Sequence, residues 1–195
     1  MTDLELDPVK TAIVVIDLQR GILAHPTAPH ASADVVSRAA ALCAAVRASG
    51  GTVVLVHVSP LPDGKDTLHP VADLPPLSPA EVAPDFSEFV PEMEPRPGDL
   101  VITKRQWGAF YGTELDLQLR RRGVDSIILC GISTNIGVES TARDAYERGY
   151  NQIFVEDATS TRAVEDHARV FATVFPRMGR VRSTAEITAA LMGQE

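Results

Sequence analysis

The feature that most constrains the fold of this chain is a repeated alternation of short apolar runs with longer stretches that end in glycine. Residues 12–16 form a continuous run rich in β-branched side chains, as expected of a strand covered on both faces. Residues 34–49 read as a helix, with Gly50 and Gly51 at its C-cap. This alternation predicts a parallel sheet with helices on both faces, joined by right-handed crossovers.

The same pattern continues along the chain. Further strands are predicted at residues 53–58, 100–103, 126–130 and 153–155, with a last short strand around Val181. Helices are predicted at residues 113–122 and 135–148 and from near Arg162, and Ser183 with Glu186 forms a capping box for a terminal helix. All of these strands and helices are needed to form one sheet and to cover its two faces. We therefore expect a single domain over residues 1–195.

Residues 59–98 interrupt this rhythm with a long segment that holds most of the prolines. Pro75 and Pro76 are adjacent, and Pro95 and Pro97 follow closely. A long, proline-stiffened connection within a compact domain is typical of a lid, a binding loop or an interface arm. The alternative is a surface excursion with no role, since proline suits any ordered loop.

Composition and charge indicate which classes of partner the protein can bind and in which cellular compartment it is expected. A net charge of −8 argues against a nucleic-acid partner, whereas a small-molecule substrate, even an anionic one, is compatible with it. No apolar run is long enough to span a bilayer, and the first residues lack a secretory signal, so we expect a cytoplasmic protein with no membrane partner. Cys43 and Cys130 are too few for a disulfide framework and are predicted to be buried.

Candidate functional residues follow the predicted strands, because ligands of open α/β sheets bind at the carboxyl ends of the strands. Asp17 leaves the first strand, where partial desolvation raises the pKa of a carboxyl group towards neutrality and suits it to acid–base work. The alternative is a carboxylate that caps a helix or braces a loop. Lys104 follows the third strand and can orient that carboxylate or bind an anion, or it is simply a solvated charge. Trp107 and Phe110 can form a pocket wall or pack the next helix.

The strand at 126–130 runs into small and polar residues and then into a helix, giving what we call the 131–137 turn. The backbone N–H groups at a helix N-terminus are free to bind an anion or an oxyanion. The alternative is an ordinary turn capped by Asn135.

Three motifs occur in order across these segments. Asp17 lies in Ile-Asp-Leu-Gln, Lys104 precedes Ala-Phe-x-Gly-Thr-x-Leu, and the 131–137 turn begins Gly-Ile-x-Thr-Asn-x-x-Val-Glu-Ser-Thr-Ala-Arg-Asp-Ala. Together they make the sequence, from about residue 9 to about residue 180, resemble the isochorismatase-like hydrolases of the cysteine hydrolase superfamily.

This resemblance implies a three-layer α/β/α sandwich with a six-stranded parallel sheet. It also implies a homo-oligomer, a dimer or tetramer whose protomers can share pockets, and no cofactor. Many such proteins are amidases with an Asp, Lys and Cys triad. In them the peptide that corresponds to Ile132–Ser133 is often cis.

The sequence departs from the family pattern at the nucleophile, because the family cysteine aligns with Gly137. With glycine at this position, the sequence resembles the true isochorismatases of the family. Those enzymes cleave an enol ether without a covalent intermediate. The resemblance then implies Asp17 as general acid, Lys104 holding a substrate oxygen and setting the Asp17 pKa, and the Gly137 N–H on a substrate carboxylate or oxygen. Further substrate contacts are expected from Gln19, Trp107, Phe110, Ile132, Ser133, Thr134 and Ile136.

No catalytic metal is predicted. Nicotinamidase-like relatives carry Asp-x-His and a later His after the second strand, but here His57 is followed only by the isolated Asp63 and His69. The five histidines are scattered along the chain and are each read as structural or solvated. Two alternatives to a cysteine-independent hydrolase stay open: a non-catalytic relative that binds a small molecule or protein, and a C–N hydrolase with another nucleophile.

Overall fold

The computed structural model describes residues 4–74 and 83–193. Its centre is a six-stranded sheet in which every neighbouring pair is parallel, in the order β3-β2-β1-β4-β5-β6. The strands are β1 Thr11–Ile16, β2 Thr52–Val58, β3 Leu100–Lys104, β4 Ser126–Ile132, β5 Asn151–Ser160 and β6 Arg180–Arg182. The predicted sheet is therefore confirmed.

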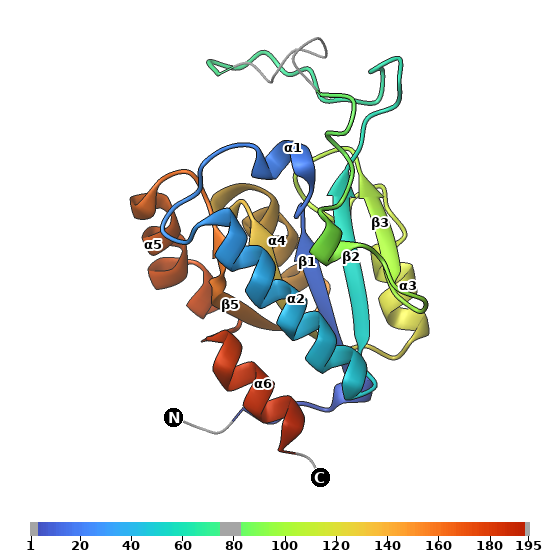
Figure 1. Cartoon of the computed structure of the whole chain (residues 1–195), viewed down its shortest axis with the longest axis vertical. Helices are drawn as coiled ribbons and strands as arrows, with labels where there is room; N and C mark the ends of the chain where they lie inside the picture. The colour runs from blue at the N-terminus through green and yellow to red at the C-terminus, as the bar shows by residue number, and fades with distance from the viewer. Residues whose placement is uncertain (1–3, 75–82, 194–195) are drawn as a thin grey trace.

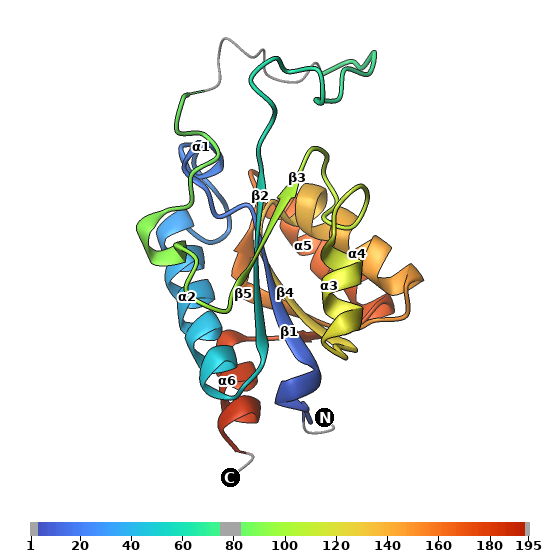
Figure 2. The ribbon, with the colours of Figure 1, turned by 90° about the vertical axis from the view of Figure 1, so that its right-hand side faces the viewer.

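Helices cover both faces of this sheet (Figure 1). Figure 2 shows α2 (Ser32–Ala48) and α6 (Thr184–Met192) on one side of the sheet, and α3 (Leu115–Arg121), α4 (Glu139–Glu147) and α5 (Val164–Thr173) on the other. Ser183 caps α6 through the expected capping box with Glu186. The arrangement is the three-layer α/β/α sandwich that the resemblance implies.

The apolar core has two halves, one on each face of the sheet, and β1 shows why its sequence is apolar throughout. Ile13 and Val15 belong to the half that also contains α2 and α6 side chains, whereas Val14 and Ile16 belong to the half beneath α3, α4 and α5. Because successive strand residues point to opposite faces, a strand covered on both sides must be apolar at every position.

Some boundaries differ from those predicted. β5 continues five residues beyond Val155, through the polar pair Glu156 and Asp157, and its pairing with β4 shifts register between Leu129 and Gly131. The sequence pattern stops at Val155 because apolar periodicity ends there, but the backbone keeps its pairing with β4. The helix expected from residue 135 begins instead as a single π-helical turn, Thr134–Val138, which leads into α4.

The short helix α1 (Arg20–Leu23) follows β1 and was not predicted. Three 3₁₀ turns, Pro8–Lys10, Pro91–Met93 and Phe175–Arg177, complete the described helical segments.

The 59–98 segment connects β2 to β3, and its first part extends well beyond the carboxyl ends of the strands (Figures 1 and 2). Its second part returns to the body, where Phe89 forms an isolated β-bridge with Gln19. Pro75 and Pro76 lie outside the described residues. A role as lid or interface arm stays a prediction.

Within residues 4–74 and 83–193, no helix combines the length and apolarity needed to cross a bilayer.

Candidate active site

Three residues from three strand ends meet at the carboxyl edge of the sheet. Asp17 directly follows β1, Lys104 is the last residue of β3, and Gly137 lies in the turn after β4. The Lys104 Nζ lies 2.7 Å from Asp17 Oδ2 and also donates a 2.7 Å hydrogen bond to the Trp107 carbonyl. Only 5% of Asp17 and 2% of Lys104 is exposed, so this ion pair is shielded from bulk water.

Gly137 faces this ion pair. A Cβ atom at position 137 would lie 3.2 Å from Asp17 Oδ2 and 3.3 Å from Lys104 Nζ. The turn is held there by Thr141, whose hydroxyl donates to the Gly137 carbonyl at 2.7 Å and accepts from the Ala109 N–H at 3.1 Å. Any side chain at 137 would therefore point at the carboxylate and the ammonium, the position that a nucleophile would need.

Burial tunes Asp17 as an acid. Desolvation raises the pKa of its carboxyl group to about 6, and the positive charge of Lys104 opposes part of that rise. Lys104 holds Oδ2, while the buried Oδ1 has no hydrogen-bond partner among the described residues. The backbone of Asp17 has a φ of 54°, a left-handed conformation that is strained for a non-glycine residue. The result is a carboxyl group that Lys104 holds at one oxygen and that has no partner at the other among the described residues.

Neither cysteine can take part in this site. Both thiols are buried, and Cys130 packs in the apolar core half that also contains Cys43 and α2 side chains. Burial raises the pKa of Cys43 to about 12 and that of Cys130 well above its ordinary value. Both side chains therefore stay as unreactive thiols at neutral pH.

We therefore expect the native protein to resist alkylation. Iodoacetamide should leave both cysteines unmodified at pH 7.5 and leave any activity unchanged, because reaction needs an accessible thiolate. Intact mass spectrometry provides the measurement, and the same treatment in guanidinium chloride should add two labels. Stoichiometric inactivation by labelling at Cys130 would contradict the cysteine-free site.

The 131–137 turn contains four of the residues that were expected to contact substrate. The Ile132–Ser133 peptide is cis, as the resemblance implied. The Ile132 side chain belongs to the apolar core, and Ile136 is 37% exposed. Thr134 is fully buried, and its hydroxyl lies 2.8 Å from His167 Nδ1.

Asn135 does not cap the helix. The N-cap position is Ser133, which makes no side-chain capping bond. The Asn135 amide instead accepts a 2.6 Å hydrogen bond from Thr161 and donates one of 3.3 Å to Asp166, so it ties the turn to the end of β5 and to α5.

The other three residues that were expected to contact substrate, Gln19, Phe110 and Trp107, differ in burial and in the groups they touch. Gln19 is fully buried, and its amide donates to the carbonyls of Val58 and Phe86 and accepts from the Val58 N–H, so it joins the end of β2 to the returning 59–98 segment. Phe110 packs in the core at 5.8 Å from the Tyr150 ring, which is the packing alternative of the sequence analysis. Trp107 is 63% exposed and lines a surface hollow of about 400 Å³.

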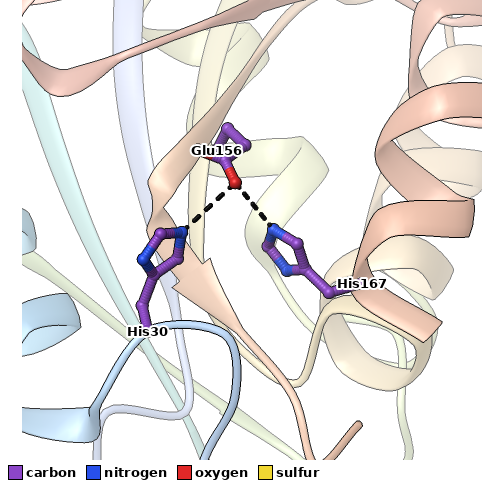
Figure 3. Close-up of side chains that lie close together, drawn as sticks. All are labelled: His30, Glu156 and His167. Carbon is purple, nitrogen blue, oxygen red and sulfur yellow. Dashed lines mark hydrogen bonds and ion pairs between the residues drawn. The ribbon is translucent and has the colours of Figure 1, made fainter. Parts of the chain in front are cut away.

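Sequence reasoning missed one polar cluster close to this site. His30, Glu156 and His167 come from the α1–α2 loop, β5 and α5, and their side chains meet (Figure 3). The histidines are scattered along the sequence, but the fold brings His30 and His167 together. No spacing motif announces the cluster, and Glu156 lies in the part of β5 that the sequence did not predict. In contrast, His57 contacts the Ser87 carbonyl and Thr103 hydroxyl.

Known proteins are similar to this chain in sequence and in fold. Residues 11–186 match the Isochorismatase domain. The chain is 51% identical over 189 residues to the uncharacterized isochorismatase family protein YecD of Escherichia coli O157:H7, covering 96% of this chain and all of that protein. The structure of an isochorismatase family protein from Burkholderia thailandensis has a TM-score of 0.91 at 48% identity, covering 96% of this chain and 97% of that one. N-carbamoylsarcosine amidase from Thermoplasma acidophilum has a TM-score of 0.72 at 32% identity, covering 90% and 96%.

Proposed function

Since the chain belongs to the isochorismatase family of hydrolases, we propose that it hydrolyses a small carboxylated substrate without a covalent cysteine intermediate. The observation that carries this proposal is the glycine at position 137, where a Cβ would lie within 3.3 Å of both Asp17 and Lys104. The nucleophile position is thus formed but holds no nucleophile.

Asp17 is the general acid in this proposal. With a pKa of about 6, about a tenth of the molecules carry the proton at pH 7, and the carboxyl group is the proton donor. Protonation of the vinyl carbon of an enol ether gives an oxocarbenium ion. Water attacks that cation, its released proton returns to Asp17, and the hemiketal collapses to a ketone and an alcohol.

Lys104 and the 131–137 turn position the substrate in the same proposal. Lys104 fixes Asp17 through Oδ2 and presents its charge to a substrate oxygen. The π-helical turn and α4 form one continuous helical segment, and the positive end of its dipole lies at the turn. The backbone N–H groups of this turn, that of Gly137 among them, suit a substrate carboxylate.

A C–N hydrolase is the second candidate, favoured by the similarity to N-carbamoylsarcosine amidase and by one contact. The Thr134 hydroxyl, the His167 ring and the Glu156 carboxylate form a chain with links of 2.8 and 3.1 Å, the order of groups that activates a hydroxyl nucleophile. Against it, Thr134 is fully buried and cannot meet a substrate without movement.

The pH dependence of turnover separates acid from base chemistry. If Asp17 donates the proton, kcat/KM should be constant below pH 6 and fall about tenfold per unit above it, because only the protonated carboxyl group is active. A base mechanism gives the opposite slope. The measurement is a pH–rate profile between pH 4.5 and 8.5, and a rate that rises through pH 6 would contradict the general-acid assignment.

The function is tested by assaying the purified protein on isochorismate and on a panel of amides that includes N-carbamoyl compounds. We expect turnover of the enol ether, detected as pyruvate release, and none of the amides. Turnover of an amide that is lost in Thr134→Val but retained in Thr134→Ser would favour the second candidate. Substrate binding without turnover across the panel would favour a non-catalytic relative.

A further inference from the structure

Two histidines and a glutamate from three separate elements converge on one point next to the 131–137 turn. His30 Nε2 lies 3.2 Å from Glu156 Oε1, and His167 Nε2 lies 3.1 Å from the same oxygen. The three side-chain atoms all lie within 4.8 Å of one another. Figure 3 shows both rings directed at the carboxylate, His30 from the loop and His167 from α5.

These groups and their spacing fit a transition-metal ion. Two imidazole nitrogens and one carboxylate oxygen are a ligand set that Zn²⁺ takes in proteins, usually with water in the fourth position. A tetrahedral ion with ligands at about 2.0–2.1 Å has ligand–ligand distances of about 3.3–3.4 Å. The two observed nitrogen–oxygen distances are within a few tenths of an ångström of that value.

The surroundings supply the outer contact that metal-binding histidines use. His167 Nδ1 is 2.8 Å from the Thr134 hydroxyl, so an Nδ1–H that donates to Thr134 leaves the Nε2 lone pair directed at the ion. In that tautomer His167 cannot act as a base for Thr134. The metal site and a Thr134 nucleophile are therefore mutually exclusive.

An ion can reach the cluster from one side. The His167 side chain is only 3% exposed, whereas those of His30 and Glu156 are 23% and 43% exposed. The buried histidine thus lies at the closed end and the other two residues at the open end. The backbone carbonyl of His30 accepts hydrogen bonds from Thr27 and Ser160, so the loop is already held against β5.

We propose that His30, Glu156 and His167 form a binding site for a divalent transition-metal ion of the Zn²⁺ class, separate from the Asp17–Lys104 pair. The ion joins the α1–α2 loop, β5 and α5 next to the 131–137 turn. It takes no part in the proton transfer assigned to Asp17, and the proposal does not depend on the proposed function.

The test uses the full-length protein, stripped with a chelator and titrated with Zn²⁺ alone against a chromophoric competitor. We expect one bound equivalent and, at a free Zn²⁺ concentration 100-fold above Kd, a rise in Tm of about 5–10 °C. Co²⁺ in the same site should give the intense visible absorption of a tetrahedral ion. His30→Ala and Glu156→Gln should each weaken binding at least 10-fold.

His25→Ala is the matched control, because His25 is an exposed histidine five residues away on the same loop. It should bind one equivalent like the parent. Since His30 and Glu156 are partly exposed, both variants should fold, which circular dichroism can check. Either of two results overturns the proposal: no stoichiometric binding by the parent, or equal affinity in the parent and the folded His30→Ala and Glu156→Gln variants.

Discussion

Replacing Asp17 by asparagine should reduce kcat/KM for the substrate by about 10²–10⁴-fold while leaving the fold intact. Asparagine nearly matches the shape of the carboxyl group and can still accept the hydrogen bond from Lys104, but its amide cannot deliver a proton. Since the loss lies in the chemical step, we expect kcat to fall with little change in KM. Steady-state kinetics on the purified variant measure both values.

The main complication is the charge that Asp17→Asn leaves behind. Lys104 is 2% exposed and would lose its counter-ion. A buried charge without a partner destabilises the folded protein. The double variant Asp17→Asn with Lys104→Met removes that charge and should also be inactive. Asp63→Asn changes an exposed carboxylate near the start of the 59–98 segment; it is the control and should keep full activity. A folded Asp17→Asn protein with near-parental turnover would exclude Asp17 from the mechanism.

The sequence predicted what depends on local pattern. The β-branched run of β1 places Asp17 at the carboxyl edge of the sheet, and the same reasoning places Lys104 after β3. Because parallel strands end at one edge, both residues lie on the same side of the sheet, and the structure shows their 2.7 Å contact across the end of β2. The fold class and the positions of these two residues therefore needed no structure.

The remainder depends on contacts between distant segments. Glu156 lies in a polar extension of β5, which pairs with β4 again at Thr159 and Ser160, and His30 reaches it from a loop more than 120 residues earlier. Phe110 illustrates the same limit, because its sequence position is equally compatible with a pocket wall and with the core packing that the structure shows. Periodicity cannot decide between these, since both require an apolar side chain.

Gly137→Cys should create one fast-reacting thiol in a protein whose own cysteines do not react. The new sulfur would project from a position whose Cβ lies 3.3 Å from Lys104 Nζ, at the start of a helical segment, and both features stabilise a thiolate. We expect its pKa to fall from about 8.5 into the range of about 3.5–7.5. The Asp17 carboxylate, 3.2 Å from the same Cβ, opposes the negative charge but can accept the thiol proton.

Space for the substitution is limited but sufficient. The Cβ would approach Ile16 Cγ2 to 3.0 Å, so Ile16 must shift by a few tenths of an ångström. Gly137→Ala introduces the same Cβ without a thiol and is therefore the matched control for this steric effect. Iodoacetamide followed by intact mass spectrometry should show one rapid label on Gly137→Cys and none on Gly137→Ala or the parent.

A reactive thiol means that the Asp17–Lys104 geometry still supports cysteine chemistry and that only the nucleophile is missing. A folded but unreactive Gly137→Cys protein means that this pocket no longer activates a thiol, and the covalent mechanism of cysteine-containing relatives then cannot be transferred to it.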